Sequence, residues 1–272
     1  MRISVSNIAW DPGEDEAIAL VLRRAGIDQI DLAPGKYFPD PFTASIADVD
    51  AVRRRWQAAG FSIAGMQALL FGTAGLNMFA DADGAMMARL CRIAEIGARL
   101  GAPCMTFGSP RQRDRSGLDD DQTMTLATDF FMRLGDEAER RDIKVCIEPN
   151  PATYGCNFLT NTIDAAMLVR ALNHPAILLQ LDVGTMIMNE ESPAELISTF
   201  ALEIGHVHAS EPGLEKLGNY IATHVDVGAA LRAHRPDIVV TIEMVASNTE
   251  SHILAVERAV EVALDAYGEQ SN

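Results

Sequence analysis

The segment IKVCIEPNPATYGCNFLTNTIDAAMLVRALNHPAILLQLD, residues 143–182, has the pattern of a strand, a helix and a second strand. Two short apolar runs, residues 143–148 and 177–182, flank the helical periodicity of residues 162–172. Neither run alternates between polar and apolar side chains. Strands of this kind are covered on both faces, which is typical of a parallel sheet built from strand–helix–strand units.

The same alternation extends along the whole chain. Apolar runs of this type lie at residues 3–8, 29–33, 62–67, 104–108, 143–148, 177–182, 205–208 and 238–244. Helical patterns separate and follow them, at residues 14–25, 45–59, 85–100, 120–141, 162–172, 192–202, 227–234 and 252–267. Eight such units without a Gly/Ser-rich linker predict a single α/β domain over residues 1–272, a closed (β/α)8 TIM barrel.

An open, doubly wound sheet is the alternative α/β architecture. Such a sheet normally carries a glycine-rich phosphate loop after its first strand. Here that turn reads AWDPGED, residues 9–15, which is neither GxGxxG nor a Walker loop. We therefore favour the closed barrel, in which the active site lies at the C-terminal ends of the strands.

Composition argues against several classes of function. The 272 residues include 22 Lys and Arg against 38 Asp and Glu, a formal net charge of −16, so nucleic acid and anionic membrane are not expected partners. No apolar stretch is long enough to predict a membrane span, and acidic residues come too early for a secretory signal. We expect a cytoplasmic protein in which Cys91, Cys104, Cys146 and Cys156 are free thiols.

Ligand-type side chains end four consecutive predicted strands. Glu148 lies in IEPN, Asp182 in LDVG, His208 in HVHASE and Glu243 in IEM. A single acid at a strand end is usually a helix cap or an arginine partner, but four ligand-type residues in succession would converge on one rim of the barrel. Three carboxylates there would repel one another, and a divalent cation relieves that repulsion. The set favours one Mn²⁺, Mg²⁺ or Co²⁺ ion, with Zn²⁺ as a further candidate.

A second histidine accompanies the predicted ligand on the seventh strand. His206 and His208 are two residues apart, so both point to the same side of the strand. We assign metal binding to His208 because it lies nearer the C-terminal rim. His206 is expected deeper in the barrel, where it would orient a ligand or contribute to the substrate site.

These four residues and their spacing resemble the metal ligands of the xylose isomerase-like TIM barrels, which include sugar-phosphate isomerases and epimerases, ketose 3-epimerases, inosose dehydratases and endonuclease IV, an AP endonuclease family 2 type. The resemblance covers essentially the whole chain. It implies a metal-dependent isomerase or epimerase of a small sugar or sugar phosphate. Proton abstraction next to a carbonyl would proceed through an enediolate, with Glu148 and Glu243 as the acid/base pair. A homodimer or homotetramer would be common for this family.

Other functions on the same scaffold remain open. A lyase that dehydrates a keto-polyol would begin with the same proton abstraction, so the sequence does not separate it from an isomerase. DNA repair of the endonuclease IV type needs additional histidine ligands and a basic groove. The six histidines and the negative charge argue against it. A binding barrel without catalysis is the remaining alternative.

Three positions depart from the pattern of the family. Thr185 stands where histidine is frequent, Tyr154 where ketose 3-epimerases usually have a second glutamate, and Leu214 at or near the place of an arginine. In the family these positions usually contact substrate hydroxyls. The resemblance therefore implies a retained metal core with a different substrate clamp, to which we assign Tyr154, Thr185 and Glu211.

Further candidates for substrate binding lie in the other rim loops. Polar and aromatic side chains at a barrel mouth can bond or cover a sugar, and the candidates are Asn7, Trp10, Lys36, Gln67 and Asn150. In GSPRQRDRSG, residues 108–117, Arg111 is the candidate for a substrate phosphate or carboxylate. The alternatives are loop packing for the tryptophan and a solvated loop, paired with local acids, for the arginine segment.

Overall fold

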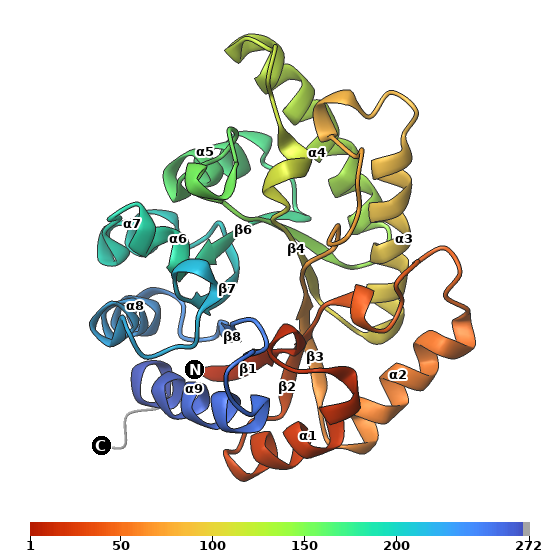
Figure 1. Cartoon of the computed structure of the whole chain (residues 1–272). Coiled ribbons are helices and arrows are strands. Elements are labelled where there is room, and N and C mark those ends of the chain that lie inside the picture. Colours follow the sequence, from red (N-terminus) through yellow and green to blue (C-terminus); the bar gives the residue numbers. More distant parts are fainter. Residues whose placement is uncertain (269–272) are drawn as a thin grey trace.

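The structure, a computed structural model, describes residues 1–268, which form a closed barrel of eight parallel strands (Figure 1). The predicted (β/α)8 TIM barrel is thereby confirmed. The strands follow one another around the barrel in chain order, and β8 pairs with β1 to close it. Their bounds are β1 Arg2–Ser6, β2 Gln29–Leu32, β3 Ser62–Met66, β4 Cys104–Phe107, β5 Lys144–Ile147, β6 Ile177–Asp182, β7 Ile204–Ser210 and β8 Val239–Glu243.

Helices form an outer layer around the strands, as Figure 1 shows. They are α1 Asp15–Arg24, α2 Ile46–Ala58, α3 Ala85–Leu100, α4 Asp120–Glu139, α5 Thr162–Leu172, α6 Val183–Met188, α7 Pro193–Phe200, α8 Ile221–His234 and α9 His252–Tyr267. Most agree with the predicted helices to within two residues at each end. The short helix α6 was not predicted, and α8 differs at its start.

The beginning of α8 is the clearest error of the sequence-based prediction. The helix begins at Ile221 rather than at residue 227. No side-chain cap marks this start. Instead, the buried carboxylate of Glu211 accepts hydrogen bonds from the backbone N–H groups of Gly218, Asn219 and Tyr220. This contact satisfies amides in the turn that leads into the helix, so a residue outside the segment fixes where it begins.

Strand register determines which polar side chains share one level of the barrel. Asp182 on β6 pairs with His208 on β7, and Ser210 on β7 pairs with Glu243 on β8. All the strands run in the same direction, so their C-terminal ends meet at a single rim. Three of the four predicted metal ligands therefore lie on neighbouring strands at that rim.

Apolar side chains fill the space between the strands and the helices. Trp10 and Trp56 are fully buried and meet edge to face, with ring centroids 6.5 Å apart. The four cysteines are free, as predicted, and all but Cys91 are buried. Among residues 1–268, no helix combines the length and the hydrophobicity that crossing a membrane requires.

Candidate functional site

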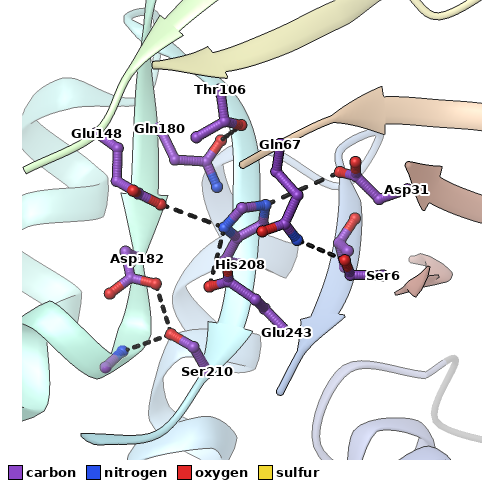
Figure 2. A network of polar contacts seen from close by, with 12 residues as sticks. Ser6, Asp31, Gln67, Thr106, Glu148, Gln180, Asp182, His208, Ser210 and Glu243 are labelled. Atoms are coloured by element: carbon purple, nitrogen blue, oxygen red, sulfur yellow. Dashed lines mark hydrogen bonds and ion pairs between the residues drawn. The ribbon is translucent and has the colours of Figure 1, made fainter. Parts of the chain in front are cut away.

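Four predicted ligands converge at the C-terminal rim of the barrel. Glu148 follows β5, Asp182 ends β6, His208 lies on β7 and Glu243 ends β8 (Figure 2). One potential ligand atom from each residue lies within 4.8 Å of those from the other three. The structure thus brings together the full set that the sequence predicts.

His208 lies at the centre of this group and is fully buried. Its Nδ1 atom is 3.3 Å from Glu148 Oε1 and 3.2 Å from Glu243 Oε2, but neither contact has hydrogen-bond geometry. A buried ring nitrogen without a partner is costly, and here it faces two carboxylates. Together, the three carboxylates and the imidazole of His208 fit the donor set of a divalent cation.

Asp182 is held by its own hydrogen bonds. Its Oδ1 atom accepts from the backbone N–H of Thr185 at 2.6 Å, and its Oδ2 atom accepts from Ser210 Oγ at 2.5 Å. The same Ser210 hydroxyl accepts from the Gly184 N–H at 2.9 Å. Asp182 is therefore the N-cap of α6 as well as a member of the carboxylate group.

Burial and mutual repulsion perturb the acids of the group. Burial, followed by the charges of Glu148 and Glu243, raises the pKa of Asp182 to about 7. Burial likewise raises the pKa of Glu243. Burial opposes a charge on His208, yet the neighbouring Glu243 carboxylate and the contacts with Asp31 and Glu148 outweigh it and hold the His208 pKa well above its usual value. Without a cation, this cluster holds protons near neutral pH.

The metal-free protein is expected to lose stability as the pH rises from about 5 to about 8. The folded-state pKa of Asp182, about 7, lies above its usual value of 3.8. Its contribution is therefore complete below the unfolded pKa and is lost as the pH rises through the folded pKa. The raised pKa values of Glu243 and His208 act in the same direction. Urea unfolding at several pH values, with a chelator present, measures this loss.

One variant and one added ion tie the loss of stability to the carboxylate group. The substitution Asp182→Asn removes one of the titrating groups, so the pH profile of the variant should be flatter. Adding Mn²⁺ to the wild-type protein should restore stability at the upper end of the pH range, because a bound ligand stabilises the folded state. A wild-type profile that rises between pH 5 and 8 would contradict the assigned shifts.

Beneath this group lies an ion pair that the sequence analysis missed. Asp31 on β2 is fully buried, and its Oδ2 atom is 2.8 Å from His206 Nε2 and 3.8 Å from His208 Nε2. A Cβ atom at Gly65 would lie 2.9 Å from the same Oδ2, so glycine leaves room for the carboxylate. The available signal was an isolated acid within the apolar run 29–33. His206 pairs in register with Gln180 on β6, whereas His208 pairs with Asp182 at the C-terminal end of that strand.

Glu148 is positioned by the loops after β4 and β5. Asn150 Nδ2 donates to Glu148 Oε2 at 3.1 Å, and the fully buried Arg113 donates Nη1 to the Glu148 carbonyl oxygen at 2.7 Å. A Cβ atom at Gly108 would lie 2.2 Å from Glu148 Oε2. The side chain therefore occupies the space that the missing Cβ leaves.

The substitution Gly108→Ala should displace the Glu148 carboxylate. With Glu148 in the acid/base role that the sequence predicts, activity should fall about 10²-fold, because a misplacement of about 1 Å at a catalytic group has that effect. The affinity for Mn²⁺ should fall with it. Gly35→Ala is the matched control, since a Cβ there meets nothing within 4 Å. Steady-state kinetics and Mn²⁺ titration of the two variants provide the test, and equal behaviour of both would refute the role of Gly108.

A cavity of about 300 Å³ opens onto the carboxylate group. Its lining combines three of the four predicted ligands with residues of the rim loops, namely Pro110, Glu148, Asn150, Tyr154, Asp182, Thr185, Gly213, Leu214 and Glu243. Three of the predicted substrate-binding residues, Asn150, Tyr154 and Thr185, are therefore placed beside the ligands. The Thr185 hydroxyl donates to the Pro149 carbonyl oxygen at 3.1 Å.

Residues 20–261 match the family model described as xylose isomerase-like TIM barrel. The chain belongs to this family. Comparison with curated protein sequences gave no match.

Solved structures share the fold of this xylose isomerase-like barrel at low sequence identity. D-psicose 3-epimerase from Clostridium cellulolyticum H10 has a TM-score of 0.80 at 17% identity, with 98% of this chain and 99% of that chain covered. 3-Keto-D-glucoside 4-epimerase from E. coli has a TM-score of 0.76 at 16% identity, with 97% of this chain and 99% of that chain covered. A sugar phosphate isomerase/epimerase from Parabacteroides distasonis has a TM-score of 0.69 at 14% identity, with 96% of this chain and 93% of that chain covered.

Four other predicted substrate-binding residues of this xylose isomerase-like barrel do not line the cavity. Trp10 is fully buried and donates Nε1 to Asp15 at 2.8 Å, and Lys36 donates to the Trp10 carbonyl oxygen. The Asn7 side chain accepts from the Ala33 N–H, and Gln67 donates to Ser6. The structure thus supports packing rather than substrate binding for Trp10. The assignment of the other three to substrate binding stays a prediction.

Two charged candidates also lie outside the lining. Glu211 is buried and holds the turn before α8, and Arg111 is exposed on the loop after β4. In the same loop Arg115 pairs with Asp120, as the solvated-loop alternative expected. The structure therefore shows a structural contact for Glu211 and no cavity contact for Arg111.

Proposed function

We propose that this protein is a divalent-metal-dependent isomerase or epimerase of a small sugar, acting by proton transfer next to a carbonyl. One observation carries the proposal. Glu148 and Glu243 reach the same buried nitrogen of His208 from two different strands, at the floor of a cavity large enough for a small substrate. The family and the sugar epimerases among the similar folds support this assignment.

Glu148, Asp182, His208 and Glu243 would hold the cation. Their mostly oxygen donor set suits Mn²⁺, Mg²⁺ or Co²⁺, with Zn²⁺ as a further candidate. When bound, such an ion polarises a carbonyl and stabilises the negative charge of an enediolate. Asp182 is restrained by Ser210 and Thr185, which leaves Glu148 and Glu243 as the carboxylates available for proton transfer.

The two glutamates can then divide the acid and base roles. Glu243 and Glu148 both line the cavity, so each carboxylate can reach a substrate bound there. Glu148 Oε2 accepts from Asn150, which restrains this carboxylate while its Oε1 atom faces His208. Two groups acting on opposite faces of a carbon give epimerisation, and one group moving a proton between neighbouring carbons gives isomerisation.

Hydrogen exchange with the solvent tests the proposal. Protein loaded with Mn²⁺ is incubated in deuterated water with a panel of free and phosphorylated ketoses and aldoses. The expected result is deuterium entering one carbon next to the carbonyl, together with a new epimer or isomer. Loss of water from the sugar would instead identify the dehydrating lyase. No exchange with any sugar of the panel would overturn the proposal.

A further inference from the structure

Leu214 is an unusual residue in the wall of the cavity. It lines the cavity while its backbone has a φ of +55°, in the left-handed region that is unfavourable for a leucine. Its N–H donates to the Glu211 carbonyl oxygen at 2.9 Å, and its carbonyl oxygen accepts from Val245 at 3.0 Å. The chain thus ties a strained leucine to the segment that follows Glu243. Strain of this kind persists where the surrounding structure imposes it, which is common at functional sites.

Tyr154 braces the same part of the wall. Its hydroxyl oxygen accepts a hydrogen bond of 2.7 Å from the N–H of Gly213, the residue before Leu214. Pro110 adds a second apolar surface to the lining. The hydroxyl proton of Tyr154 remains free to donate. The wall therefore offers apolar surface from Leu214 and Pro110 and one neutral donor.

Positive charge is missing from this lining. No lysine or arginine is among the described residues that line the cavity, whereas three carboxylates are. Three cations of the nearby loops contact other groups: Lys36 the Trp10 carbonyl, Arg115 Asp120 and Lys216 Glu250. Arg113 donates to the Glu148 carbonyl and is fully buried outside the lining. Arg111 is exposed and outside the lining. Three carboxylates and one dication leave a net negative charge, so an anionic substrate would lose its hydration without gaining a lysine or arginine partner.

We propose that the substrate is an uncharged hydroxy-ketone with an apolar carbon edge that packs on Leu214, which makes Leu214 a specificity-determining residue. This inference rests on the proposed function and names its substrate class. A carbon that carries hydrogen in place of hydroxyl packs better against Leu214 and Pro110, because neither of these side chains can bond a hydroxyl. A phosphate fits it worst.

Four matched probes test the inference: D-fructose, 1-deoxy-D-fructose, 6-deoxy-D-fructose and D-fructose 6-phosphate. With protein loaded with Mn²⁺, kcat/KM for one of the deoxy sugars should exceed that for D-fructose about 10-fold, the lower end of what one apolar group contributes in a pocket. The phosphate should fall at least about 100-fold below D-fructose. Isothermal titration calorimetry of the same four probes should give the same order of affinity.

The substitution Leu214→Asn separates the wall from the rest of the site. Asparagine tolerates a positive φ, so the backbone is kept while the surface becomes polar. The preference for the deoxy sugar should disappear or reverse. Leu202→Asn is the control, since Leu202 is 90% exposed and outside the cavity. Arg111→Gln should leave the ratio of phosphate to D-fructose unchanged.

The outcomes distinguish this inference from the proposed function. Turnover without a deoxy preference, a preference for the phosphate, or a preference that survives Leu214→Asn would overturn the inference and leave the proposed function standing. If no probe is turned over but calorimetry shows the expected order and its loss in Leu214→Asn, the wall is correctly assigned, and the deuterium-exchange panel decides the proposed function separately. Absence of both binding and turnover with all four probes would overturn the inference.

Discussion

Replacing Glu243 by glutamine is expected to lower kcat/KM by about 10²–10⁴-fold, the contribution of a positioned general acid or base. Glutamine keeps the size of the side chain but cannot accept the proton. It also removes one anion from a group of three, which weakens the affinity for a divalent cation. The variant should remain folded, because relief of repulsion near Asp182 and Glu148 offsets the lost contact with His208.

Measurements at increasing Mn²⁺ concentration separate the two roles proposed for Glu243, metal binding and proton transfer. Activity that returns fully at saturating Mn²⁺ would show that Glu243 is only a ligand. Activity that stays low with the metal bound supports proton transfer. Glu261→Gln, at an exposed position on α9, is the control and should behave as the wild type. A Glu243→Gln variant within about threefold of wild type at every Mn²⁺ concentration would sink the assigned mechanism.

The second large effect is expected from Asp31→Ala, which should lower the free energy of unfolding by about 3–5 kcal/mol. The carboxylate is fully buried and lies 2.8 Å from His206 Nε2, so its removal takes the charged partner from a buried imidazole and leaves only the Thr241 hydroxyl at that nitrogen. The ring of His208 loses the carboxylate that lies 3.8 Å from its Nε2 atom, and Mn²⁺ affinity should drop about 10–100-fold. Urea unfolding and Mn²⁺ titration at neutral pH measure the two losses.

Asp28→Ala supplies the comparison for this variant. Asp28 pairs with Arg2 at the surface, where its side chain is 65% exposed, and such pairs contribute about 0–1 kcal/mol. A difference between the two variants therefore reports burial rather than the loss of any aspartate. Similar stabilities for Asp31→Ala and Asp28→Ala would contradict the role given to the buried pair.

The barrel could be predicted because its periodic signal repeats along the chain. Each strand–helix unit, such as residues 143–182, has the same pattern, so errors at single boundaries do not change the topology. The convergence of Glu148, Asp182, His208 and Glu243 followed from the same regularity, since the ends of parallel strands meet at one rim. Their roles as metal ligands and catalysts remain our proposal.

Features that depend on contacts distant in the sequence could not be predicted. Asp31 lies within an apolar strand, and its partner His206 lies far along the chain. Glu211 follows a strand just as the predicted ligands do, yet it accepts from backbone N–H groups instead of facing the cavity. Trp10 follows β1 at the mouth end, but its ring is fully buried against Trp56 of α2. Position along a strand predicts height in the barrel, not the direction of a loop side chain.

Asp182 both caps α6 and belongs to the carboxylate group, and this has a consequence for comparing relatives of this protein. An aspartate that begins α6 would be retained by selection for the helix alone, even in a descendant that had abandoned catalysis. Its presence in another sequence is therefore weak evidence of a working centre. Glu243 ends its strand and faces His208, and no helix begins at it, so its retention would follow from the proton-transfer role that we propose for it. A relative that lacks this glutamate is therefore expected to lack the proposed isomerase or epimerase activity.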